Sequence, residues 1–286
     1  MNAPESDNPY APKQALKPTA ELYGELAGDG MEQLASASIS FIDFASSSEA
    51  IVHDIGCGLG AATAAIVAAS SANNTKITGS DIDDKVLGIY REQIAKNNWP
   101  AEAVKADAIA LPFANGTFTH IIGNALLFVL PNNGIDAMKE MYRTLKPNGI
   151  AIVNSWAYLP TLPAIVAACE KTRPAGTPLP RQGLEKWESE DFLRNIVLQG
   201  GFTVDKVKME KKDVFVTIGE LKHFATMLWS FIGGTSAAGW LESDEENWDV
   251  AVDTVVEALK KSEGFEELGE GKNKIMFKAN VVVAKK

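Results

Sequence analysis

The sequence has few cysteines and no long apolar run. Its two cysteines, Cys57 and Cys169, are too few for a disulfide framework and form no CxxC pair, so nothing indicates secretion or a structural zinc site. No segment reaches the roughly 20 apolar residues of a membrane span. Residues 1–18 hold four prolines and lack the apolar stretch of a signal peptide. These absences predict a reduced protein of the cytoplasm with no bound metal.

Basic residues are also in the minority. The chain of 286 residues has 27 Lys and Arg against 37 Asp and Glu, a formal net charge of −10, and no long basic run. Binding to a phosphate backbone depends on clustered cationic side chains, so we expect neither nucleic acid nor an anionic membrane as a partner. With 46% hydrophobic residues the chain can bury a large core. It is expected to be a monomer or a homodimer.

Strand and helix patterns alternate from residue 50 onward, which predicts an α/β fold with a doubly wound, mostly parallel sheet. Residues 1–49 are expected to form an arm and helices over a ligand site, 50–158 a Rossmann-like core, and 159–286 lid helices with the last strands of the same domain. The expected strands are 50–55, 77–81, 101–106, 118–123, 150–155 and 274–284. The expected helices are 60–70, 83–96, 135–145, 189–199, 218–231 and 246–260, with a turn at 146–149 and a strand or hairpin within 202–216.

A glycine-rich loop follows the first predicted strand. The segment Val52-His-Asp-Ile-Gly-Cys-Gly-Leu-Gly60 ends a strand, turns through three glycines and enters a helix of small residues. Glycine lets the backbone turn tightly and lets a ligand approach it, while the helix start offers free N–H groups. The same loop also satisfies the G-x-G-x-x-A variant of the dinucleotide fingerprint. The glycine-rich loop alone therefore does not identify the ligand.

Three carboxylates at successive strand ends indicate which kind of ligand the glycine-rich loop binds. Asp54 precedes the first glycine, where a carboxylate crowds a pyrophosphate but suits an ammonium group. Asp81 ends the next strand, where it is placed to accept hydrogen bonds from both hydroxyls of a ribose. Asp107 follows the third strand, where it is placed to meet the exocyclic amine of an adenine. The carboxyl ends of parallel strands share one sheet edge, so the set favours an adenosine with net positive charge.

At this point the sequence resembles the class I S-adenosylmethionine-dependent methyltransferases. Within that family it is most similar to the branch around the ubiquinone and menaquinone methyltransferases and to fungal-type small-molecule methyltransferases of secondary metabolism. The resemblance covers roughly residues 50–155. The matching segments are Asp54-Ile-Gly-Cys-Gly-Leu-Gly60, Gly79-Ser-Asp-Ile82, Ala106-Asp-Ala-Ile-Ala-Leu-Pro-Phe113, Gly123-Asn-Ala-Leu-Leu127 and Tyr142-Arg-Thr-Leu-Lys-Pro-Asn-Gly149.

The resemblance implies a seven-stranded Rossmann-like sheet with an antiparallel final strand and a helical lid. It also implies that S-adenosyl-L-methionine is the cofactor and S-adenosyl-L-homocysteine the product. The implied cofactor-binding residues are Asp54 with Gly56, Gly58 and Gly60 for the methionine part, Asp81 with Ile82 at the ribose, Asp107 with Ala108 at the adenine, and Gly123 with Asn124 at the amino group. Tyr23 is expected to help cover the cofactor.

Two departures from the family pattern matter for the assignment of a catalytic residue. Phe118-Thr119 stands where Phe-Asp is common, and Phe128 occupies a position that is often polar. No catalytic residue is therefore transferred from a relative.

Large aromatic residues in the second half predict an apolar, partly enclosed acceptor pocket for a small molecule. The candidate pocket residues are Phe128, Trp156, Tyr158, Phe224 and Trp229. Of the three histidines, His53 and His120 lie on predicted strands and are interpreted as structural. His223, in an amphipathic helix, is the candidate general base.

Methyl transfer from a sulfonium is an in-line displacement, so the protein mainly aligns the nucleophile and excludes water. A phenol usually needs a base, whereas a thiol ionises readily and an amine needs only a modest proton acceptor. The scarcity of histidine favours a sulfur or nitrogen acceptor. Three alternatives stay open: an O- or C-methyltransferase acting on a phenol or quinone, an NAD-dependent oxidoreductase, and a non-methylating regulator with a methyltransferase fold.

Overall fold

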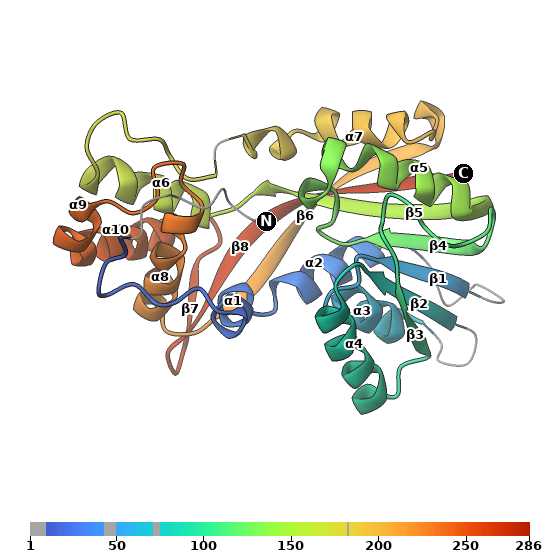
Figure 1. Ribbon diagram of the computed structural model, residues 1–286, viewed down its shortest axis with the longest axis horizontal. Helices are drawn as coiled ribbons and strands as arrows, with labels where there is room; N and C mark the ends of the chain where they lie inside the picture. The colour runs from blue at the N-terminus through green and yellow to red at the C-terminus, as the bar shows by residue number, and fades with distance from the viewer. Residues whose placement is uncertain (1–9, 43–49, 71–74, 182) are drawn as a thin grey trace. The chain divides into compact units, whose positions relative to one another are not determined.

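The computed structural model describes residues 10–42, 50–70, 75–181 and 183–286 of the chain. The first nine residues of the predicted arm lie outside the described residues. Within the described part, the strands form one mixed sheet in the order β3-β2-β1-β4-β5-β8-β6, with β7 paired to β8 (Figure 1). The strands are β1 (Ala50–Ile55), β2 (Thr75–Asp81), β3 (Ala101–Lys105), β4 (Phe118–Gly123), β5 (Leu145–Tyr158), β6 (Val207–Ile218), β7 (Glu266–Gly269) and β8 (Lys272–Lys285).

The first five strands form the parallel part of the sheet. β1 pairs with β2 and β4, β2 pairs with β3, and β4 pairs with β5, all in parallel. In this register Asp54 lies beside Gly79 and Ile122. The ends of β1, β2, β3 and β4 therefore meet at one edge of the sheet, as the sequence predicts for its three carboxylates.

Helices lie on both faces of the parallel strands, so the α/β fold with a doubly wound sheet is confirmed. Figure 1 shows α3 and α4 on one face and α5 and α7 on the other. The helices are α1 (Ala20–Ala27), α2 (Gly30–Ile39), α3 (Ala61–Ala69), α4 (Asp84–Asn97), α5 (Ile135–Thr144), α6 (Thr161–Thr172), α7 (Glu190–Gln199), α8 (Leu221–Ser230), α9 (Glu242–Glu246) and α10 (Trp248–Lys260).

Local sequence sets the limits of these helices. The Asp83 side chain accepts hydrogen bonds from the backbone N–H groups of Lys85 and Val86, so Asp83 is the N-cap of α4. Ser189 caps α7 in the same way through the N–H of Phe192. The turn of residues 98–100 after α4 begins with Asn98 in the left-handed conformation. These caps explain why the starts predicted for these two helices, at residues 83 and 189, agree with the structure within one residue, whereas α8 begins three residues after its predicted start.

The strand β8 lies between β5 and β6 in the sheet. Lys286 donates its N–H to the carbonyl of Gly149 and accepts a bond from the N–H of Asn148, so the end of β8 lies beside the start of β5. The two neighbouring strands therefore run in opposite directions, which confirms the predicted antiparallel final strand.

One prediction about strands needs correction, and one strand was not predicted. Residues 146–149 are not a free turn, because they belong to β5 as an irregularity between the pairs Phe118–Leu145 and His120–Ile150. Residues 207–218 form the single strand β6, which is one of the two alternatives expected for this segment. The short exposed strand β7, which pairs with β8, is not predicted because its Glu-Glu-Leu-Gly sequence has no apolar alternation.

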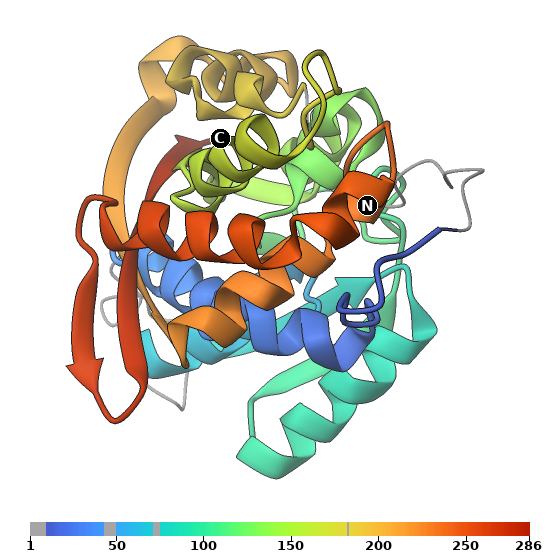
Figure 2. The same ribbon diagram turned by 90° about the vertical axis from the view of Figure 1, so that its left-hand side faces the viewer.

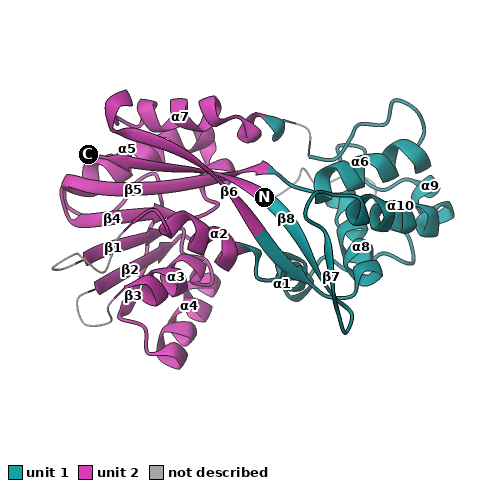
Figure 3. Ribbon diagram, turned by 180° about the vertical axis from the view of Figure 1, so that it is seen from behind, with its two compact units in different colours: residues 1–30, 158–185, 215–277 teal, residues 31–157, 186–214, 278–286 magenta. Residues whose placement is uncertain are grey.

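The chain forms two compact units, drawn in two colours in Figure 3. Unit 1 comprises residues 1–30, 158–185 and 215–277, and unit 2 comprises residues 31–157, 186–214 and 278–286. In unit 1, α10 packs against α6 and α8, and α1 contacts α8 (Figure 2). No helix of the described residues is long and apolar enough to cross a membrane.

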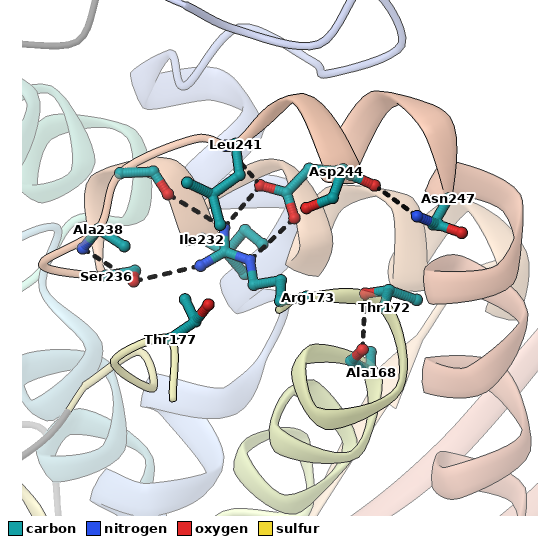
Figure 4. A network of polar contacts seen from close by, with 12 residues as sticks. Ala168, Thr172, Arg173, Thr177, Ile232, Ser236, Ala238, Leu241, Asp244 and Asn247 are labelled. Atoms are coloured by element: carbon teal, nitrogen blue, oxygen red, sulfur yellow. Dashed lines mark hydrogen bonds and ion pairs between the residues drawn. The ribbon is translucent and has the colours of Figure 1, made fainter. Parts of the chain in front are cut away.

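A buried ion pair joins two segments of unit 1 (Figure 4). Arg173, directly after α6, donates from Nε and Nη2 to the two carboxylate oxygens of Asp244, each at 2.8 Å. The same guanidinium also reaches the Gly239 carbonyl at 3.0 Å, and Leu241 donates its N–H to Asp244. The two charged side chains are 1% and 0% exposed. The network therefore fixes the segment between α8 and α9 onto the end of α6.

Candidate functional site

The glycine-rich loop connects β1 to α3 with all three glycines in the left-handed region. Their φ angles are +69° at Gly56, +52° at Gly58 and +94° at Gly60. A Cβ at Gly56 or Gly60 lies within 2.7 Å of Leu126 or Trp99, whereas a Cβ at Gly58 meets nothing within 4 Å. Packing therefore requires the outer two glycines. The middle glycine faces open space, where a ligand can approach the backbone.

Asp81 links this loop to the end of β2. Its Oδ2 accepts the N–H of Gly58 at 3.2 Å, and its Oδ1 accepts the N–H of Asp83 at 3.1 Å. The side chain is half-buried, and each carboxylate oxygen has a lone pair left for a ligand donor. Next to it, Ile82 is 63% exposed. An oriented carboxylate beside an exposed apolar side chain fits a ribose with an adjacent base.

Asp107 holds the equivalent position after β3. Its Oδ1 accepts the N–H of Ile109 at 3.1 Å, so the carboxylate is fixed by a local turn that also contains Ala108. Both residues are half-buried. The sequence predicts an adenine contact here, and the fixed carboxylate has the chemistry for it.

The segment after Asp107 is held by a residue that sequence reasoning missed. Arg143 of α5 donates to the carbonyls of Leu111 and Phe113 at 3.0 and 2.7 Å, and pairs with Glu140 at 2.7 Å. Glu140 in turn accepts the N–H of Leu111. Arg143 lies in the segment Tyr142-Arg-Thr-Leu, which matches the family pattern. The sequence alone does not show that its side chain contacts carbonyls about 30 residues earlier in the chain.

Asp54 is the most buried of the three carboxylates, at 1% exposure. Its Oδ2 accepts both the N–H and the hydroxyl of Thr63, at 3.0 and 2.7 Å, and the Thr63 hydroxyl also contacts the hydroxyl of Tyr90 at 2.7 Å. Burial raises the pKa of Asp54 to about 6, against the lowering effect of the Thr63 bonds. Among the described residues Oδ1 has no protein donor, which leaves it free for an ammonium group.

Gly123 ends β4 at the same sheet edge, and Asn124 follows directly after it. The Asn124 side chain donates to the Met31 carbonyl at 3.1 Å and accepts a bond from Asn154 at 2.9 Å. Asn154 also accepts the N–H of Ala125, which has a φ of +53°. Both ends of the Asn124 amide are therefore engaged within the protein, and α2 is tied to the end of β4. Asn154 itself was not predicted.

The predicted acceptor residues divide between the two units. In unit 2, half-buried Phe128 meets Trp187 edge to face at 6.0 Å, and Trp156 is half-buried. In unit 1, Tyr158 is half-buried, whereas Phe224 and Trp229 of α8 are 3% and 0% exposed and form part of the core. Tyr23 of α1 is 58% exposed and packs edge-on against Phe231. A common pocket for these residues stays a prediction.

The three histidines differ in their surroundings. Burial lowers the pKa of His53 to about 3 and that of His120 to about 4, so both are neutral at pH 7. His53 contacts Ser80 and stacks on Phe118, which agrees with a structural role. His223 of α8 is half-exposed, and its Nε2 lies 2.9 Å from a carboxylate oxygen of Glu25. A carboxylate in contact with imidazole orients the ring as in a general base.

Comparison with known proteins agrees with this geometry. Residues 52–149, which contain the loop and all three carboxylates, match the family model described as methyltransferase domain. Residues 52–149 are therefore similar to a methyltransferase domain.

Two curated relatives align with part of the chain. Demethylmenaquinone methyltransferase of Staphylococcus aureus is 32% identical over 110 residues, which cover 38% of this chain and 44% of that protein. Carboxy-S-adenosyl-L-methionine synthase of Photorhabdus laumondii is 26% identical over 105 residues, which cover 36% of this chain and 41% of that protein. The chain spans less than half the length of these relatives.

Solved structures extend the likeness in fold to most of the chain. The crystal structure of a putative methyltransferase from Bacillus halodurans has a TM-score of 0.53 and 17% identity, and the match covers 87% of this chain and 97% of that one. Phosphoethanolamine N-methyltransferase 2 of Haemonchus contortus, solved with phosphomonomethylethanolamine and S-adenosylhomocysteine, has a TM-score of 0.52 and 14% identity, with coverage of 93% and 56%. At these identities the likeness concerns the fold.

Proposed function

We propose that this chain, through the methyltransferase domain at residues 52–149, transfers a methyl group from S-adenosylmethionine to a small, largely apolar acceptor. The observation that carries the proposal is the arrangement at one sheet edge of an open glycine, Gly58, with the oriented carboxylates Asp81 and Asp107. When bound, S-adenosylmethionine supplies an electrophilic methyl group on a sulfonium. The residues of the chain bind and orient it.

Each side chain has a defined part in binding. Asp81 and Asp107 are held by backbone N–H groups before any ligand arrives, so little entropy is lost when they accept further hydrogen bonds. Asp54 offers one oxygen for an ammonium group and keeps the other on Thr63. These contacts favour S-adenosylmethionine over NAD. The pyrophosphate of NAD would lie near the Asp54 carboxylate and place like charges together.

We propose a sulfur or nitrogen atom as the nucleophile. Two of the three histidines are buried and have a low pKa, so neither offers a basic nitrogen to an acceptor. His223, paired with Glu25, is the remaining candidate for removing a proton, and an amine or a thiol needs less help from a base than a phenol does. A role in secondary metabolism in the cytoplasm, as a monomer or homodimer, belongs to the same proposal.

A transfer assay tests this proposal. The full chain is incubated with S-adenosylmethionine carrying an isotope-labelled methyl group and with matched single-ring acceptors, namely a thiol, an amine, a phenol and a quinol. We expect label in the thiol or amine product, and a lower rate with His223→Gln at unchanged cofactor affinity. Label in the phenol or quinol alone would overturn the assignment of the nucleophile. Cofactor binding without transfer to any acceptor would favour the non-methylating alternative.

A further inference from the structure

Unit 1 contains a partly open cavity of about 150 Å³ that is separate from the residues discussed above. One side is formed by residues 11–18, here called the strap, and the other by the end of α8 and the short helix η5 (Ile232–Gly234). Its apolar lining comes from Leu16 and Pro18 of the strap and from Phe231, Gly234 and Trp240 opposite. The cavity shares no residue with the glycine loop, the three carboxylates or the predicted acceptor residues.

Polar contacts hold the strap across this cavity. Leu16 donates its N–H to the Ser230 hydroxyl at 3.0 Å. Closer to the N-terminus, the Tyr10 hydroxyl and the Lys13 ammonium both contact the Glu245 carboxylate, at 2.9 and 3.0 Å. The strap and the residue before it are thus fixed to the rest of unit 1 at two places.

The lining offers few polar groups to an occupant. The Ser230 hydroxyl accepts from Leu16 and donates to the Thr226 carbonyl at 2.7 Å, so its proton is already used. Lys17, the charged residue of the lining, is exposed. A charged or strongly polar molecule would lose hydration here without gaining matched hydrogen bonds. The lining therefore favours a neutral, apolar occupant.

We propose that the strap cavity binds a neutral single-ring aromatic compound. An apolar cavity of about 150 Å³ is large enough for benzene. The side chains of Phe231 and Trp240, which line the cavity, provide the apolar contact area that such a ring requires. The proposal concerns binding alone and does not depend on methyl transfer.

Fluorobenzene binding, followed by ¹⁹F NMR on the full chain without cofactor, tests the proposal. The blocking variant is Gly234→Val, because a Cβ at Gly234 meets nothing within 4 Å and Gly234 lines the cavity. The matched control is Gly88→Val in α4, where a Cβ also meets nothing. We expect saturable binding with the same Kd in the wild type and the control, and a Kd raised at least tenfold in Gly234→Val.

A second ligand and a second variant complete the test. 1-Fluoronaphthalene, with two fused rings, is expected to bind at least tenfold more weakly than fluorobenzene. If Gly234→Val does not fold, Ala15→Leu fills the cavity from the half-exposed strap side and carries the same expectation. Absence of saturable fluorobenzene binding, equal binding by a blocking variant, or equal binding of both ligands would overturn the proposal. A loss of methyl transfer without these changes would concern the proposed function only.

Discussion

Asp81 joins the glycine loop to the end of β2 and presents its carboxylate at the sheet edge. We predict that Asp81→Ala raises the Kd for S-adenosylmethionine at least tenfold, because hydrogen bonds to a charged group contribute about 1.5–3 kcal/mol each. Calorimetric titration measures the change. Asp83→Asn is the matched control, since it alters an exposed helix cap two residues away that an asparagine also satisfies. Unchanged affinity in Asp81→Ala would contradict the ribose assignment.

The buried Asp54 predicts a pH-dependent difference between the wild type and Asp54→Asn. Its pKa is raised from 3.8 to about 6 in the folded protein, so the folded state binds the proton more tightly than the unfolded state. Relative to Asp54→Asn, the wild type therefore loses stability as the pH rises from about 4 to 6 and stays less stable above that. Asparagine can still accept both Thr63 bonds and carries no buried charge.

Thermal unfolding between pH 4 and pH 8 measures this difference. We expect Asp54→Asn to melt above the wild type at pH 7.5 and level with it near pH 4. The effects of the buried His53 and His120 are common to both proteins and cancel in the comparison. A constant difference across the pH range would show that Asp54 has no raised pKa. The same variant is expected to bind S-adenosylmethionine more weakly, because the ammonium loses its anionic partner.

The sequence predicted the site residues whose position follows from the end of a strand. It did not predict those whose side chains bond residues distant in the sequence. Asp81 and Asp107 could be placed because parallel strands end at one edge. Thr63, Asn154 and Arg143 could not, because their partners are 9 to 32 residues away and depend on side-chain packing. The sequence also could not decide whether Trp229 lies in the core or lines a pocket, since an aromatic residue on an amphipathic helix fits either place equally well. In the structure it is buried in the core.

At the scale of elements, α5 positions the segment after Asp107 through Arg143. We predict that Arg143→Ala speeds backbone amide exchange in residues 107–115 and weakens S-adenosylmethionine binding about threefold to tenfold, because two carbonyls lose a charged donor. Hydrogen exchange with mass spectrometry and titration give the two readouts. Lys139→Ala, which removes an exposed ion pair from the same helix, is the control. Unchanged exchange in 107–115 would contradict the positioning role.

The ends of strands and helices were predictable where the sequence contains clear start and stop signals. The strands at 50–55 and 118–123 agree with the structure at both ends because apolar runs there stop at polar or glycine residues. The irregular start of β5 was not predictable, because Lys-Pro-Asn-Gly reads locally as a turn and becomes part of a strand only beside β4. Its pairing is therefore determined by tertiary contacts and not by propensity.

At the scale of the whole molecule, the Arg173–Asp244 pair predicts how unit 1 responds to charge removal. Arg173→Met leaves Asp244 buried and uncompensated, which costs about 3–5 kcal/mol of unfolding free energy. The double variant Arg173→Met with Asp244→Leu is expected to regain much of this loss, because no lone charge stays buried. Urea unfolding of both variants measures it, with Lys222→Ala in an exposed pair as control. A double variant as unstable as the single one would contradict this explanation.

The most direct test of the central claim is calorimetric titration of the full chain with S-adenosylmethionine, S-adenosylhomocysteine and NAD under identical conditions. The arrangement of Gly58, Asp81 and Asp107 predicts micromolar binding of both sulfur compounds and no binding of NAD. Binding of NAD alone would contradict the assigned roles of the three carboxylates and favour an oxidoreductase.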